Sequence, residues 1–128
     1  MRKIFFAVIF AALLFGADFE WYGYKEGLAE AKNSGKPVMV MISQKGCGMC
    51  EYMEDVAFED PQLAEYIEEH FIPVKLTPKE AKALGFRVFG TPTYYILRPD
   101  GTRAAKPLAG GATAKVFLQK LQELRRGL

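Results

Sequence analysis

Histidine and cysteine are scarce in this chain of 128 residues, which contains one histidine and two cysteines. A tetrahedral zinc site needs about four such ligands, so we expect no complete zinc site and no metal cofactor within the chain. Excess charge is also small, because the formal net charge is +2 and Arg2 and Lys3 account for it. Balanced charge without a long basic run gives no reason to expect a nucleic-acid partner.

The chain also lacks an apolar run long enough to cross a bilayer comfortably, which takes about 20 residues. The longest uninterrupted run covers residues 4–15, with two basic residues before it and two small residues after it, ahead of the polar Asp18. A positive start, an apolar middle and small residues at the exit are typical of a secretory signal. We therefore predict a signal peptide over residues 1–17 and export to a compartment where disulfides persist. An uncleaved segment that tethers the protein to the membrane stays open as an alternative.

Residues 18–128 are predicted to form one domain in which strand and helix patterns alternate. The predicted strands cover residues 38–42, 71–76, 93–97 and 103–108, and the predicted helices cover residues 21–34, 47–58, 61–70, 78–84 and 114–126. Helices between strands imply crossovers and parallel pairing, whereas a tight turn implies antiparallel pairing. The order therefore predicts an α/β fold with a mixed central sheet of about four strands and helices on both faces. Five apolar residues of the last helix are expected to face the core: Val116, Phe117, Leu118, Leu121 and Leu124.

The two cysteines, Cys47 and Cys50, are separated by two residues and lie between a buried strand and a predicted helix. A sulfur at a helix start meets the positive end of the helix dipole, which lowers the pKa of the thiol. Such a pair can close and reopen a disulfide with another protein. A static structural disulfide is the alternative, but so short a loop stabilises little. A two-cysteine site for a soft metal such as Cu(I) also stays open.

The motifs together resemble the thioredoxin superfamily over nearly all of residues 20–126. They are a strand leading to Cys-Gly-Met-Cys at a helix start, Thr-Pro-Thr before a strand, and a Pro-Asp-Gly hairpin. The stretches that carry the resemblance are AKNSGKPVMVMISQKGCGMC, FIPVKL and GTPTYYILRPDG. They are most similar to exported bacterial thioredoxin-like proteins, including the C-terminal domain of the transmembrane thiol:disulfide interchange reductase.

The resemblance implies a role for each matching residue. Cys47 matches the exposed attacking cysteine, and Cys50 matches the buried resolving cysteine. Pro92 matches a cis-proline that lies against the disulfide and helps to dock an extended substrate segment. Thr91 offers backbone groups to that substrate, and Lys75 matches a lysine near the buried cysteine.

The sequence departs from the family at the position that usually accepts the proton of the buried cysteine. Thioredoxins carry a buried aspartate there, whereas this chain has Met41. The proton of Cys50 could instead be accepted by Lys75, Glu51, Glu54 or water, and the sequence does not distinguish among them.

A second departure concerns the surface around the cysteines. Gly46 stands where thioredoxins usually carry a tryptophan, and Met49 stands between the cysteines in place of proline. We expect Met49 to be exposed and to touch the substrate together with Gly46. The other methionines of this region are expected to lie in the core: Met39, Met41 and Met53.

These observations predict an exported, periplasmic thiol–disulfide oxidoreductase that reduces or isomerises disulfides. The cysteine pair is its redox centre, so no dissolved cofactor is expected. The expected partners are proteins with a disulfide and a membrane-bound thiol–disulfide electron-transfer partner, and the expected state is a monomer. The rival hypothesis is a binding module without turnover, such as a Cu(I) metallochaperone or an assembly factor on the same fold.

Overall fold

The computed structural model of the protein describes residues 19–128. The predicted signal peptide, residues 1–17, lies outside the described residues. Within residues 19–128, no helix has the length and apolar character that crossing a membrane requires.

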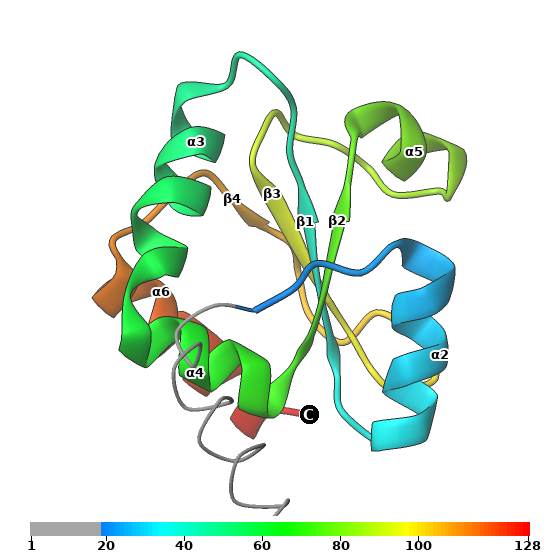
Figure 1. The fold of residues 1–128 in the computed structure, drawn as a ribbon. Coiled ribbons are helices and arrows are strands. Elements are labelled where there is room, and N and C mark those ends of the chain that lie inside the picture. The colour runs from blue at the N-terminus through cyan, green and yellow to red at the C-terminus, as the bar shows by residue number, and fades with distance from the viewer. Residues whose placement is uncertain (1–18) are drawn as a thin grey trace, which may run out of the picture.

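The described chain alternates helices and strands around one sheet. The helices are α2 (Tyr24–Ser34), α3 (Gly48–Asp55), α4 (Pro61–His70), α5 (Pro78–Ala83) and α6 (Ala114–Arg126), with a short 3-10 helix η1 (Ala57–Glu59). The strands are β1 (Val38–Ile42), β2 (Ile72–Leu76), β3 (Thr93–Leu97) and β4 (Leu108–Ala109). Figure 1 shows the sheet at the centre, with α3, α4 and α6 on one side and α2 and α5 on the other.

The sheet has the strand order β2-β1-β3-β4. Strand β1 pairs in parallel with β2, which follows after a crossover through α3 and α4, and antiparallel with β3. Strand β4 pairs antiparallel with β3, so the sheet is mixed. The predicted thioredoxin-like architecture, with about four strands and helices on both faces, is confirmed.

Alternate residues of the strands point into two separate cores. The core on the α3 side, here called the site-side core, contains Met39, Met41, Cys50, Met53, Ala57, Phe58, Leu63, Ile67, Phe71, Tyr94, Ile96, Phe117 and Leu121. The core on the α2 and α5 side, here called the far-side core, contains Ala31, Val38, Val40, Ile42, Ile72, Val74, Leu76, Ala81, Phe86, Tyr95 and Leu97. Every residue of β1 and β3 is buried, which explains why β1 is a continuous apolar run in the sequence.

Local signals in the sequence fix several helix ends. The Asp60 carboxylate accepts a hydrogen bond from the Leu63 N–H at the start of α4, and Pro61 occupies the first turn. Thr77 and Glu80 form a reciprocal capping box at the start of α5. These two predicted helix starts are confirmed.

The first two predicted helices are longer than the observed ones. The helix predicted from Trp21 begins at Tyr24, because Tyr22 pairs instead with β2 through hydrogen bonds to Pro73 and Lys75. The helix predicted through Phe58 ends at Asp55, and the 3-10 turn that follows buries Phe58 among aromatic rings.

The predictions near the C-terminus need two corrections. The strand predicted over residues 103–108 is reduced to Leu108–Ala109 and an isolated bridge between Arg103 and Leu97. Pro107 has no N–H to donate to a ladder, which accounts for the interruption. In α6, Phe117 and Leu121 are buried as expected, but Val116 is 44% exposed and does not face the core.

Candidate functional site: the Cys47–Cys50 pair

Cys47 and Cys50 form a disulfide at the N-terminus of α3. Cys47 is the N-cap residue of this helix, and its sulfur accepts a hydrogen bond from the Cys50 N–H at 3.1 Å. The Cys47 side chain is partly exposed, whereas Cys50 is 1% exposed. One sulfur is therefore open to a partner at the positive end of a helix, while the other lies behind it in the site-side core.

Thr91 and Pro92 lie directly beside the disulfide. The peptide bond between them is cis, and the Thr91 carbonyl oxygen lies 3.4 Å from the Cys47 Sγ. Pro92 is buried, and its carbonyl oxygen accepts a hydrogen bond from the Gly110 N–H at 2.8 Å. Because Gly110 follows β4, this bond ties the loop after β4 to the segment beside the disulfide.

Gly46 and Met49 flank the cysteine pair on the surface. Gly46 has a φ of +78°, a left-handed conformation that most side chains disfavour. Met49 is 47% exposed between the two cysteines, as expected from the sequence. Its side chain lies over Gly111, where an added methyl group would overlap the Met49 sulfur.

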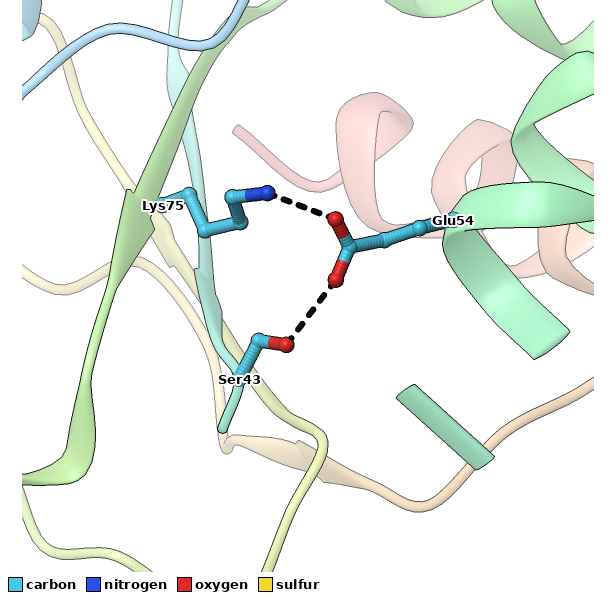
Figure 2. A network of polar contacts seen from close by, with 3 residues as sticks. All are labelled: Ser43, Glu54 and Lys75. Atoms are coloured by element: carbon cyan, nitrogen blue, oxygen red, sulfur yellow. Dashed lines mark hydrogen bonds and ion pairs between the residues drawn. The ribbon is translucent and has the colours of Figure 1, made fainter. Parts of the chain in front are cut away.

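A polar network of three residues connects α3 to the sheet, as Figure 2 shows. The Glu54 carboxylate accepts a hydrogen bond from the Lys75 Nζ at 2.6 Å through one oxygen and from the Ser43 hydroxyl at 3.0 Å through the other. These three residues and Cys50 line one pocket of about 390 Å³. Lys75 thus lines this pocket from β2 and bonds to Glu54, although its side chain stays 37% exposed.

Met41 fills the place of the aspartate that thioredoxins usually carry, and it is fully buried. The strand register aligns Met41 with Lys75 on one side and with Tyr94 on the other. Residues aligned across a sheet point to the same face, so all three lie on the face that α3 covers. The carboxylate of this site therefore comes from Glu54 on the helix rather than from the strand.

Glu54 was one of several candidates from the sequence. Glu51 and Glu54 both line the pocket at Cys50, but Glu51 is exposed, whereas Glu54 is half-buried and held by two hydrogen bonds. The sequence signal that favours Glu54 is its position four residues after Cys50, because residues four apart share one face of a helix. Ser43 and Tyr94 were missed. Only the packing of α3 on the sheet brings them to the site, and no local motif marks either residue.

A second pocket of about 600 Å³ lies between the segment before α2 and strand β2. It is larger than the pocket at Cys50, but neither cysteine lines it. In the described part of the chain, no group of three or more His, Cys, Asp or Glu residues is arranged to hold a metal ion.

A thioredoxin-like fold with a disulfide at a helix start, one sulfur accessible and one buried, defines the general class of thiol–disulfide oxidoreductases. Comparison with known families agrees with this class. Residues 24–125 match the family described as "Thioredoxin-like domain", and the chain belongs to that family.

Solved structures share the fold across most of the chain. A thioredoxin from Thermus thermophilus is 29% identical, with a TM-score of 0.73, and the match covers 84% of this chain and 88% of that one. The oxidised C-terminal domain of DsbD from Neisseria meningitidis is 24% identical, with a TM-score of 0.60 and coverage of 83% and 100%. The second likeness shows the fold alone.

Among curated proteins, human spermatogenesis-associated protein 20 is 26% identical over 62 residues, which is 48% of this chain. The chain spans only 8% of the length of that relative.

Proposed function

We propose that this protein is a thiol–disulfide oxidoreductase that exchanges disulfides with exported proteins, in the direction of reduction or isomerisation. The observation that carries the proposal is the arrangement of the two sulfurs. Cys47 is partly exposed at the N-terminus of α3, beside the Thr91 carbonyl, and Cys50 is buried behind it. This is the geometry needed for one attacking and one resolving thiol.

The reaction as a reductant has two steps. The Cys47 thiolate attacks one sulfur of a substrate disulfide, which forms a mixed disulfide and releases the other substrate sulfur as a thiolate. The Cys50 thiolate then attacks the Cys47 sulfur, which closes the Cys47–Cys50 bond and releases the second substrate thiolate. Two electrons pass from the protein to the substrate, and the cysteine pair must be reduced again before the next turnover.

Cys50 has to lose a proton before the second step. We assign the acceptor to Glu54, because its carboxylate lines the same pocket as Cys50 and is oriented by Lys75 and Ser43. Glu51 and Glu80 also line this pocket, but both are exposed. Lys75 acts on this step by holding the carboxylate in place. The proton then leaves through the pocket to water or to the released thiolate.

The substrate is expected to lie over the surface formed by Gly46, Met49 and Thr91, and the buried Pro92 supports this surface from behind Thr91. Gly46 leaves the approach to Cys47 open because it carries no side chain, and a bulkier residue would be strained at its positive φ. Met49 offers a flexible apolar contact beside the sulfur. The backbone of Thr91 is available to an extended substrate segment.

The apolar pattern of residues 1–17 supports a periplasmic location. The segment is either cleaved after export or retained as a tether to the membrane. In that compartment the partners are proteins with a disulfide and a membrane-bound thiol–disulfide partner that reduces the pair again. Both cysteines and the Thr91–Pro92 segment come from one chain, so the site is complete in a monomer.

Insulin reduction tests the proposal. The reduced wild-type protein is expected to precipitate insulin chains in the presence of dithiothreitol faster than the reductant alone, and Cys47→Ser is expected to reduce that rate to background. A wild-type protein that shows no activity but binds Cu(I) tightly through the two thiols would contradict the proposal and favour the metallochaperone hypothesis.

A further inference from the structure

The hydroxyl of Tyr94 has no evident function in the fold. Tyr94 is 1% exposed, and no group of residues 19–128 lies within hydrogen-bond distance of its hydroxyl. An unpaired buried hydroxyl destabilises a folded protein, and phenylalanine would fill the same space without that loss. The next residue, Tyr95, is satisfied, because its hydroxyl donates a hydrogen bond to the Arg87 carbonyl at 2.6 Å.

The position of Tyr94 connects it to the site. Tyr94 is aligned with Met41, which in turn is aligned with Lys75, so the three form a row across the sheet under α3. Cys50 from α3 belongs to the same core cluster as Tyr94. Tyr94 therefore lies on the face of the sheet that α3 covers, the face on which Cys50 and Glu54 also lie.

The charged group that acts on Tyr94 is the Glu54 carboxylate on α3, which is bonded to Lys75 of β2. The pocket of Glu54 is also lined by three exposed charged residues: Lys45, Glu51 and Glu80. The rings of Phe58 from η1 and Phe117 from α6 pack against the Tyr94 ring. Burial, and next the negative charge of Glu54, raise the pKa of Tyr94 above its ordinary range, so the phenol keeps its proton and can only donate to an anion.

We propose that Tyr94 is a positioning residue for the proton step at Cys50. Its hydroxyl donates a hydrogen bond, through a buried water molecule, to the Glu54 carboxylate that takes the Cys50 proton. In this step the S–H bond of Cys50 breaks, the water passes the proton on, and an O–H bond forms on Glu54. The inference rests on the function proposed above. It explains why a hydroxyl is kept where an apolar side chain would be more stable.

The test measures the resolving step by itself. The Cys47 thiolate attacks dithiobis(nitrobenzoate), which releases one coloured thionitrobenzoate anion and leaves the other half bound to Cys47 in a mixed disulfide. The attack of Cys50 then displaces this second thionitrobenzoate. Its release is followed by stopped-flow absorbance as a function of pH. Tyr94→Phe is compared with Tyr95→Phe, its neighbour on the opposite face of the same strand.

We expect Tyr94→Phe to slow the release by about threefold to tenfold on the acidic limb and to move the profile upward by about half a pH unit or more. The carboxylate anion loses a hydrogen-bond donor in this variant, so it is formed at higher pH. Tyr95→Phe should leave the profile unchanged although it loses a satisfied hydrogen bond. In a Glu54→Gln background, Tyr94→Phe should have no further effect.

Two results would overturn the inference. One is an unchanged profile for a Tyr94→Phe protein whose thermal unfolding shows an intact fold. The other is the same shift with and without Glu54, which would indicate a change of packing rather than of proton transfer. A wild-type protein that never releases the second coloured group contradicts the proposed function itself and thus differs from both results.

Discussion

The two faces of the central sheet are formed by the same strands, but they differ in whether their buried polar groups are hydrogen-bonded. On the far side, the Tyr95 hydroxyl is bonded to a carbonyl, and the Arg103 guanidinium stacks on Phe86 while bonding to the Gly85 carbonyl. On the site side, the Tyr94 hydroxyl has no partner among the groups of residues 19–128, and a carboxylate lines the same pocket as a buried sulfur. The polar groups named on the far side therefore contribute to stability, whereas the site side keeps reactive and unsatisfied groups that lower stability.

The largest expected effect on disulfide exchange comes from replacing Cys50, the buried cysteine of the pair. Cys50→Ser leaves Cys47 able to attack but removes the group that resolves the mixed disulfide. Covalent complexes with client proteins should therefore accumulate and be visible on non-reducing gels. The matched control is the Cys47→Ser, Cys50→Ser double variant, which should trap nothing. Recovery of no covalent partner with Cys50→Ser would count against protein substrates.

The next effect concerns the carboxylate on α3. Glu54→Gln keeps the shape of the side chain but cannot take a proton, so the release of thionitrobenzoate should slow by about tenfold to a hundredfold at neutral pH. Glu51→Gln is the control, because Glu51 lies on the same helix but is exposed. Equal effects of the two substitutions would show that the site has no specific acceptor at residue 54.

A far-side substitution should separate stability from reactivity. Leu97 is fully buried in the far-side core, so Leu97→Ala should lower the free energy of unfolding by about 2–5 kcal/mol. The resolving step of the folded variant should keep the wild-type rate and pH profile. Chemical denaturation and stopped-flow measurements check the two parts. A changed pH profile would remove the distinction between the two faces.

The smallest expected effect lies in the hairpin loop. Hydrogen bonds from the Thr102 N–H and hydroxyl lower the pKa of Asp100. A lowered pKa adds stability above the unfolded-state value, about 4, and that stability is lost as the pH falls through the folded-state value. The acid-side loss of stability should therefore be slightly weaker in Asp100→Asn, with activity unchanged. Thermal unfolding between about pH 2 and pH 6 checks this; identical slopes would contradict it.

Much of the fold could be predicted from the sequence because its signals are local. A continuous apolar run marked β1, largely apolar segments marked β2 and β3, and the Asp60 and Thr77 caps marked two helices. The errors arose where tertiary contacts decided the outcome. Tyr22 joined β2 rather than a helix, and the chain near Pro107 formed a bridge and a two-residue strand rather than a full strand.

The candidate site was predictable only in part. The spacing of Cys47 and Cys50 and the helix that follows them are readable from the chain. The choice of Glu54 over Glu51 needed the side of α3 that faces the sheet. The unpaired hydroxyl of Tyr94 could not be predicted, because strand residues alternate between faces and only the packed structure shows which polar groups find partners.

The central claim, that Cys47 is an accessible nucleophile backed by Cys50, is tested most directly by alkylation of the reduced protein with limiting iodoacetamide. The labelled residue is located by mass spectrometry, and the labelling rate is followed against pH. The account predicts that Cys47 is labelled first, with a midpoint well below the value of about 8.5 for a free cysteine. Equal labelling of the two thiols, or a Cys47 that reacts like a free cysteine, would contradict it.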